Sequence, residues 1–169
     1  KVYLHSVIMM EASIVVRPPD TWVSTLCTAG NKNVQFRTCL PYGSKGGRGL
    51  IEFDDDIDNA GLIEKIRAHP SVERVEISRT EDGRISASVI NRSCCASQAL
   101  AASDCFLMSA CSLGEGRVRW KLVTGMEGSL LSLVRSLRDA GCETEVEWVR
   151  SIRESNLLTK RQEEVLRTA

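Results

Sequence analysis

Apolar and polar residues alternate in two successive series of short segments, separated by the turn-forming residues Glu81-Asp82-Gly83. In the first series, alternation at every second residue or a short apolar run predicts strands at residues 2–16, 34–40, 50–53 and 75–77. Capping residues and apolar residues at helical spacing predict helices at residues 20–29 and 57–68. The first series therefore has the element order β-α-β-β-α-β.

The second series repeats this order without repeating the letters. Strands are predicted at residues 85–89, 105–111, 117–123 and 146–152, and helices at residues 93–103 and 127–140. Strand 117–123 alternates most regularly, with Arg117, Arg119 and Lys121 between its apolar residues. This strand should turn one face to the core and the other to water. Trp120 and Trp148 fall on apolar strand faces, so we expect both in the core.

Each series matches the split βαβ or ferredoxin-like arrangement, an antiparallel sheet of four strands with two helices on one face. We therefore predict an α+β fold of two tandem βαββαβ modules, at residues 1–80 and 84–153. Residues 154–169 are expected to be a linker and the start of a helix-turn-helix domain. The paired modules are similar to ACT-type regulatory modules. That resemblance is one of fold, and it implies a small effector bound where modules pair.

Composition narrows the classes of function. The chain has 22 basic and 22 acidic residues, whereas phosphate-binding surfaces usually need a basic excess, so we do not expect residues 1–157 to bind DNA. The sequence has no apolar run long enough to cross a membrane and no apparent secretory signal. Its seven cysteines lack the spacing of a secreted disulfide framework, which favours a cytoplasmic protein with reduced thiols and no membrane partner.

The sequence predicts no catalytic site. The two histidines, His5 and His69, lie in different elements, and no triad, cysteine–histidine or paired-glutamate arrangement has usable spacing. The glycine-rich segment 41–49 lacks the strand and helix context of a phosphate-binding loop, so we expect a hairpin loop there. The protein is therefore not expected to be an enzyme.

The cysteines of the second series are the main candidates for chemistry. Cys94 and Cys95 begin a predicted helix, where the helix dipole and free amides lower the pKa of a thiol. The predicted topology brings Cys111 and Cys142 to the same edge of the sheet. These four thiols could hold a soft metal ion such as zinc or copper(I), or form a redox-switched disulfide.

Three observations weigh against a thiol site. Structural zinc sites favour two cysteines separated by two residues, whereas Cys94 and Cys95 are adjacent. The alternation of side chains along a strand can also point Cys111 away from the helices. Free cysteine is also among the most commonly buried residues, and Cys27 and Cys39 are interpreted as plain core residues. Cys105 is expected about one helix length, roughly 15 Å, from the other thiols.

The C-terminal segment carries the features of a helix start. Thr159 is suited to cap a helix, and Gln162, three residues later, completes a capping box, with Leu158 before the cap as a hydrophobic staple. Leu166 and Ala169 then recur at helical spacing. An amphipathic helix without special function has the same pattern.

The letters of this segment, LTxRQxEVLxxA over residues 158–169, resemble the first turns of the helix-turn-helix in the archaeal bacterio-opsin-activator family of transcription regulators. The LuxR-type opening is a weaker match because it usually has Arg-Glu where Arg161-Gln162 stands. Residues 117–157 resemble the region before the helix-turn-helix in the same family. The resemblance implies DNA binding through a helix-turn-helix that starts with Leu158, Thr159, Arg161, Gln162 and Leu166 and whose recognition helix is missing from this chain.

We therefore expect the sensor and dimerisation region of a DNA-binding transcription regulator, acting as a homodimer because two-fold pairs read half-site spacing. Its input would be a small effector or chemistry at the thiols. Two alternatives stay open. One is a free-standing ACT-like module that binds a small molecule, and the other is a cysteine-based metal or redox sensor.

Overall fold

The computed structural model describes residues 8–19, 21–23, 25, 34–53 and 59–152. The strands are β1 (Met10–Arg17), β2 (Val34–Tyr42), β3 (Gly46–Phe53), β4 (Val72–Arg79), β5 (Ile85–Asn91), β6 (Phe106–Gly114), β7 (Arg117–Thr124) and β8 (Glu143–Ser151). The helices are α2 (Asn59–Ala68), α3 (Cys95–Ala101) and α4 (Ser129–Asp139). Each lies where the sequence pattern predicts an element of that type, whereas most of the helix expected at residues 20–29 falls outside the described residues.

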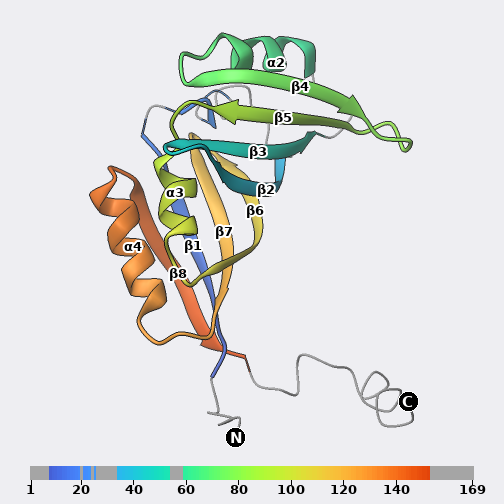
Figure 1. Ribbon diagram of the computed structural model, residues 1–169. Coiled ribbons are helices and arrows are strands. Elements are labelled where there is room, and N and C mark those ends of the chain that lie inside the picture. The colour runs from blue at the N-terminus through green and yellow to red at the C-terminus, as the bar shows by residue number, and fades with distance from the viewer. Residues whose placement is uncertain (1–7, 20, 24, 26–33, 54–58, 153–169) are drawn as a thin grey trace, which may run out of the picture.

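All eight strands belong to one antiparallel sheet with the order β4-β5-β3-β2-β6-β7-β1-β8. The sheet twists strongly, so that β4, β5, β3 and β2 run across the view of Figure 1 while β6, β7, β1 and β8 run down it. The two groups are joined by β2 and β6, which pair only at Gln35–Cys111 and Phe36–Ala110. The sheet is therefore continuous but narrowly connected in its middle.

The prediction of two tandem ferredoxin-like, ACT-like modules is wrong. A ferredoxin-like module pairs its first strand with its own third and fourth strands, but here β5 lies between β3 and β4, and β1 lies between β7 and β8. The turn between β4 and β5 explains the exchange. Thr80 N–H donates to Arg84 O at 2.9 Å, and Gly83, with φ +88°, closes the turn. Such a tight turn forces its two strands to pair with each other, so β5 joins the first group and leaves its expected place to β1.

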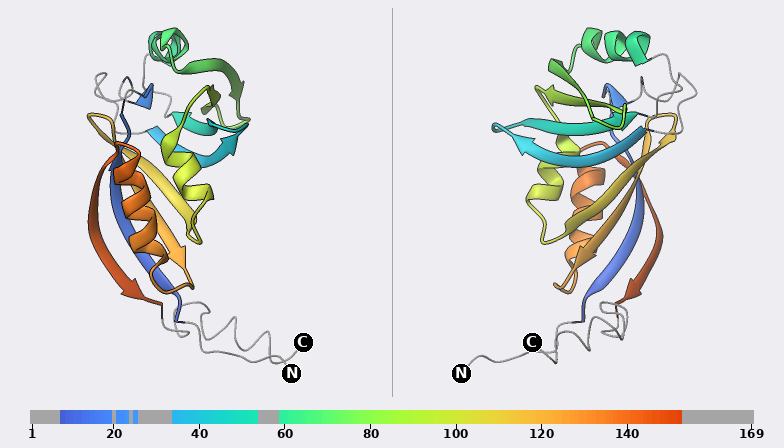
Figure 2. Two further views of the ribbon diagram at one scale, coloured as in Figure 1. Left: turned by 60° about the vertical axis from the view of Figure 1, so that its left-hand side comes forward. Right: turned by 90° about the vertical axis from the view of Figure 1, so that its right-hand side faces the viewer.

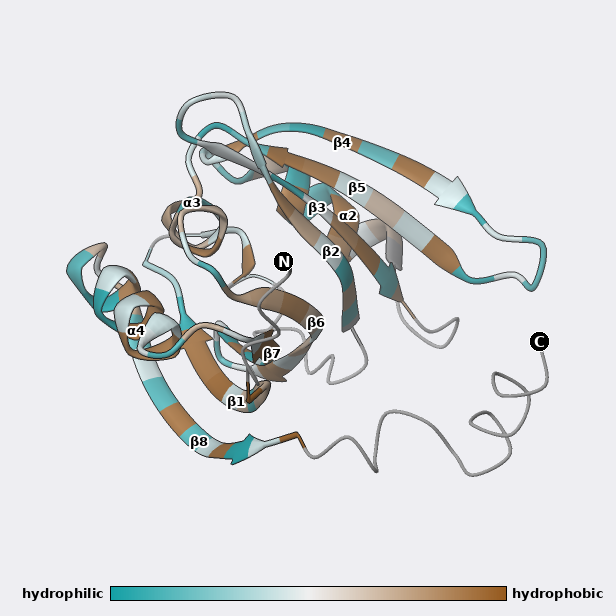
Figure 3. Cartoon of the chain, turned by 60° about the horizontal axis from the view of Figure 1, so that its bottom comes forward, coloured by the Kyte–Doolittle hydropathy of each residue, from teal (hydrophilic) through white to brown (hydrophobic). Residues whose placement is uncertain are grey.

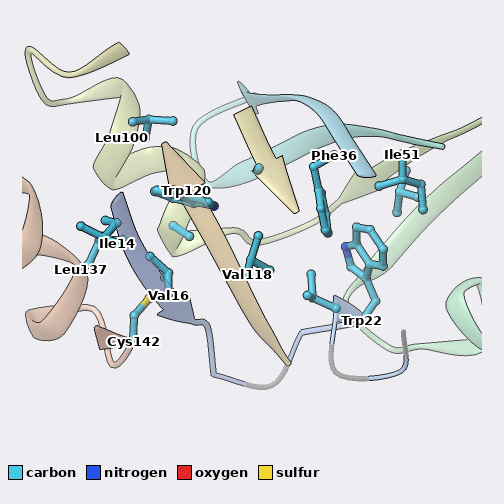
Figure 4. Packing of buried hydrophobic residues seen from close by; sticks show 14 of the residues in the cluster. Ile14, Val16, Trp22, Phe36, Ile51, Leu100, Val118, Trp120, Leu137 and Cys142 are labelled. Atoms are coloured by element: carbon cyan, nitrogen blue, oxygen red, sulfur yellow. The ribbon is translucent and has the colours of Figure 1, made fainter. Parts of the chain in front are cut away.

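The helices cover one face of the sheet, with α3 and α4 side by side and α2 packed against β4 (Figure 2). Apolar side chains from both groups of strands and from the helices form one buried cluster. Figure 4 shows how Trp22 lies beside Phe36 and Ile51 at one end of this cluster, while Cys142 lies near Val16 at the other. The buried cluster therefore continues across both groups of strands.

Strand β1 is central to the second group. Ile14 and Val16 are fully buried towards the helices, opposite Trp120 and Val118 of β7. The alternate residues Ser13 and Val15 point to the opposite face, which no described helix covers. The expected burial of Trp120 is thereby confirmed, with 4% of its surface exposed.

The face without helices carries charge in the second group. Glu147 of β8 accepts hydrogen bonds from Arg119 Nε and Nη2 at 2.8 and 2.7 Å, and from Ser13 Oγ at 2.6 Å. A register shift between Ser13 and Ile14 places Trp148 opposite Ser13, so this tryptophan lies on the polar face with Arg150 over its ring. Its expected place in the core is therefore wrong. Figure 3 shows that hydrophilic and hydrophobic residues alternate along β8.

Within the described residues, the longest apolar helical stretch falls short of what a membrane crossing requires.

Candidate functional site: thiol pairs at the start of α3

The start of α3 is fixed against the hairpin between β2 and β3. Cys94 N–H donates to Lys45 O at 2.9 Å, and Gln98 Nε2 donates to Gly46 O at 2.7 Å. Gly47 is required by this close approach, because a Cβ there would lie 2.6 Å from Cys94 Cβ and 3.1 Å from its Sγ. The glycine-rich segment is thus a hairpin, as expected, and it also forms the seat for Cys94.

Cys142 is held by the C-terminal end of α4. Gly141 adopts φ +88° and its N–H donates to Arg138 O, while Cys142 N–H donates to Leu137 O, both at 2.9 Å. This left-handed ending at glycine satisfies carbonyls that the end of the helix would otherwise leave unpaired. It turns the chain into β8 and directs Cys142 into the core, where 4% of its surface is exposed.

Four cysteines gather there as two pairs. The Sγ atoms of Cys95 and Cys142 lie 3.7 Å apart. Cys39 of β2 is paired with Gly49, on the sheet face where Cys94 packs against Gly47, and Cys39 and Cys94 shift each other's pKa. Cys39, Cys94 and Cys95 are all half-buried. The two pairs share the first turn of α3, since Cys94 and Cys95 are adjacent.

Within each pair the acidity is unequal. The hydrogen bond from Cys142 lowers the pKa of Cys95 to about 7, against the effect of burial. The hydrogen bond from Cys39 lowers the pKa of Cys94 to about 6, with further help from the Ser97 hydroxyl and the backbone N–H groups of the first turn of α3. Charge on Cys94 raises the pKa of Cys95, so ionisation of one thiol opposes ionisation of its neighbour.

The partner thiols stay protonated. Hydrogen bonding to Cys95, followed by burial, raises the pKa of Cys142. Hydrogen bonding to Cys94, followed by burial, raises the pKa of Cys39. Each pair therefore contains one thiolate near neutral pH and one thiol that donates to it. Thiolates are the nucleophilic form of cysteine, so Cys94 and Cys95 are the reactive sulfurs.

The structure brings together three of the four candidate cysteines. Cys94, Cys95 and Cys142 come together, but Cys111 pairs with Arg119 on the face without helices. Alternation along β6 accounts for this, because the neighbouring residue Ala110 is the one that points into the core.

Cys39 is the site residue that sequence reasoning missed, since it was interpreted as plain core. Its strand partner Gly49 lies two residues from Gly47, on the face that carries the start of α3. Cys105 is buried, and desolvation raises its pKa. Cys27 and the predicted helix-turn-helix residues Leu158, Thr159, Arg161, Gln162 and Leu166 lie outside the described residues.

Metal-ligand geometry is not found within the described ranges: there, no group of three or more histidine, cysteine, aspartate or glutamate side chains is arranged to hold a metal ion. The same thiols instead lie as two pairs, each with one ionised and one protonated member. The Cys95 and Cys142 sulfurs lie at a distance from which a disulfide can form with a small shift of their elements.

The chain matches no protein-family model and no curated protein.

Proposed function

We propose that the chain is the regulatory region of a DNA-binding transcription regulator, and that its input is oxidation of Cys95 and Cys142 to a disulfide. The observation that carries the proposal is the 3.7 Å approach of these two sulfurs from different elements. Cys95 is half-exposed and ionised near neutral pH, while Cys142 is buried and protonated. A thiol switch needs this asymmetry, because one sulfur must attack the oxidant and the other must then attack the product.

The oxidant in this proposal is a hydroperoxide. The Cys95 thiolate attacks the terminal oxygen, the O–O bond breaks, and the departing oxygen takes a proton to leave as water or an alcohol. Cys95 is then a sulfenic acid. The Cys142 sulfur attacks it, the S–O bond breaks, and the hydroxyl group leaves as water with the Cys142 proton. Two thiols lose two electrons in total, and the peroxide gains them.

Oxidation would strain the end of α4. A disulfide bond is about 2.05 Å long, so the sulfurs must approach by about 1.7 Å. Cys95 begins α3 and Cys142 immediately precedes β8, so the bond draws the turn between α4 and β8 towards α3. β8 is an edge strand that pairs only with β1 among the described strands, and it leads towards residues 153–169. Movement of β8 is the proposed route from the thiols to the C-terminal segment.

The DNA-binding output has its support in the sequence. Residues 158–169 resemble the opening of a helix-turn-helix, and a homodimer is proposed because paired units read half-site spacing. A soft metal ion has weaker support than a disulfide, because Cys111 lies on the opposite face of the sheet from the other three predicted ligands.

Peptide mapping after titration with hydrogen peroxide tests the input. We expect one Cys95–Cys142 disulfide in the wild type, none in Cys95→Ser or Cys142→Ser, and an unchanged yield in Cys111→Ser, which alters a thiol on the other face. We also expect slower amide hydrogen exchange over residues 140–151 after oxidation of the wild type but not of Cys95→Ser. If Cys95 and Cys142 remain free thiols in the oxidised wild type, the proposal is wrong.

A separate experiment tests the proposed output, regulated DNA binding, by measuring how much random-sequence duplex DNA the chain retains at low salt. Binding that differs between the reduced and oxidised chains supports regulation of a DNA-binding unit. Equal, measurable binding in the two states contradicts the output. Because the chain lacks the expected recognition helix, absence of binding in both states leaves the decision to sedimentation equilibrium, in which a chain that stays monomeric in both states contradicts the proposed homodimer. The thiol chemistry is judged separately by peptide mapping.

A further inference from the structure

Strands β2 and β6 diverge beyond their short region of pairing (Figure 2), and a crevice is lined by residues of both strands. Beyond their two shared pairs, residues 37–42 of β2 and 106–109 of β6 have no strand partner on their facing edges within the described chain. The crevice between them has a volume of about 310 Å³ and is bounded by Leu100 and Ala101 of α3. Sites for small molecules start at about this size, roughly 300 Å³.

Cys39 lies in the wall of this crevice, on the sheet face where Cys94 packs against Gly47. Cys94, which is seated against Gly47, does not line the crevice. A molecule in the crevice therefore meets one sulfur of the pair and not the other.

We propose that the crevice binds a low-molecular-weight peptide thiol, which reduces a Cys39–Cys94 disulfide by attacking the Cys39 sulfur. The inference rests on the proposed thiol chemistry but uses the other pair of sulfurs. We expect the ligand to be a peptide because, among the described strands, the facing edges of β2 and β6 are unpaired along the crevice. Backbone N–H and C=O groups at a free strand edge are the partners that an extended peptide pairs with.

The disulfide forms by the same two steps as above. The Cys94 thiolate attacks a hydroperoxide, and the Cys39 sulfur then attacks the resulting sulfenic acid and releases water. The bond would join β2 to the start of α3, and thus the first series of elements to the second.

Reduction begins when the thiolate of the peptide attacks the Cys39 sulfur. The S–S bond breaks, Cys94 leaves as a thiolate, and Cys39 holds the peptide in a mixed disulfide. A second peptide thiolate then attacks the sulfur of the bound peptide, Cys39 leaves and takes a proton, and the oxidised peptide disulfide is released. Attack at Cys39 is favoured over attack at Cys94 because the more acidic thiol is the better leaving group.

The first test uses the Cys95→Ser, Cys142→Ser double variant, which cannot form the other disulfide. We oxidise it with hydrogen peroxide, add glutathione as the probe, quench with acid and map the peptides. The expected intermediate has glutathione on Cys39 and a free thiol on Cys94. Glutathione on Cys94, or no Cys39–Cys94 disulfide after oxidation, overturns the inference. Neither result touches the Cys95–Cys142 proposal, which is decided by peptide mapping of the wild type.

The second test closes the crevice. Ala101→Trp adds an indole at an exposed lining position, while Ala102→Trp adds the same group at the adjacent exposed position outside the lining. We expect Ala101→Trp to slow reduction by glutathione several-fold and Ala102→Trp to leave it unchanged. Equal rates in the two variants overturn the crevice as the route.

A third test compares two thiols on the protein that carries neither tryptophan. Because 2-mercaptoethanol has no peptide groups, it should reduce the Cys39–Cys94 disulfide more slowly than glutathione does, after both rates are corrected for thiol pKa. Equal corrected rates overturn the peptide specificity.

Discussion

The Cys142 thiol donates a hydrogen bond to Cys95 across 3.7 Å, and this contact is what makes Cys95 acidic. The donor comes from the turn after α4 and the acceptor from the first turn of α3, so the acidity of Cys95 depends on how these two helices pack. A change in packing would therefore change reactivity, and formation of the disulfide would change packing.

Replacing Cys142 by alanine removes the donor and should raise the pKa of Cys95 from about 7 towards the ordinary thiol value, about 8.5. The rate of Cys95 alkylation by iodoacetamide, followed by peptide mass spectrometry from pH 5 to 10, measures this pKa. At pH 7 the rate should fall roughly tenfold, because less of the thiol is ionised. Cys111→Ala, on the other face of the sheet, is the matched control and should leave the profile unchanged. An unchanged profile in Cys142→Ala would show that this contact does not set the acidity.

Gly47 and Gly49 form a second matched pair, on one face of one strand. A Cβ at position 47 would overlap Cys94, whereas a Cβ at position 49 would meet its nearest neighbours, Thr38 O and Trp22 Cζ2, at 3.9 Å. We expect Gly47→Ala to lower the free energy of unfolding by about 1–3 kcal/mol through overpacking. Gly49→Ala should stay within about 0.5 kcal/mol of the wild type, in urea unfolding of the reduced proteins. Similar losses in both variants would mean that α3 is not seated on Gly47.

The type of each described element could be predicted from the sequence, but the strand order could not. Periodicity reports which residues share a face, and it located the strands around Phe36 and Trp120 and the helix around Leu137. The order depends on contacts between distant segments. The turn at Gly83 was visible in the sequence, yet it was interpreted as a boundary between modules rather than as a hairpin that commits β5 to β4.

The candidate site was predictable where local chemistry decides it. The first turn of α3 marked Cys94 and Cys95, and the glycine ending of α4 fixed Cys142. Cys39 was missed because its approach to Cys94 requires β2 to lie beneath α3, which follows only from the observed strand order. Trp148 was misplaced for another reason: one extra residue in β8 reverses the faces of the residues that follow it, and alternation alone does not reveal such a bulge.

Two leucines of α4 test whether the helix is held by its buried face. Leu137 is fully buried in the core cluster, while Leu131 has 54% of its surface exposed. We expect Leu137→Ala to lower the free energy of unfolding by about 2–5 kcal/mol, because it leaves a cavity. Leu131→Ala should change it by less than about 0.5 kcal/mol. Urea unfolding at one pH and temperature measures both. A comparable loss in the two variants would mean that α4 does not pack on the sheet as described.

The ion pair between Arg119 and Glu147 predicts a pH dependence. Hydrogen bonds from Arg119 and then Ser13 hold the pKa of Glu147 below its ordinary value. A carboxyl whose pKa is lower in the folded than in the unfolded state stabilises the protein above its unfolded pKa, about 4.3, and this contribution is lost as the pH falls through the folded value.

Glu147→Gln should therefore be less stable than the wild type at pH 7, by roughly 0.2–1 kcal/mol because the pair is partly exposed, and the difference should shrink as the pH falls through the lowered pKa of Glu147. Glu145→Gln changes the same charge two residues earlier, where no ion pair is found among the described side chains, and serves as the control. Urea unfolding at pH 7, 5 and 3 measures the three proteins. A constant difference between Glu147→Gln and the wild type at all three pH values would show that the variant acts through packing in the bulge of β8, since only the titration of Glu147 makes the difference depend on pH.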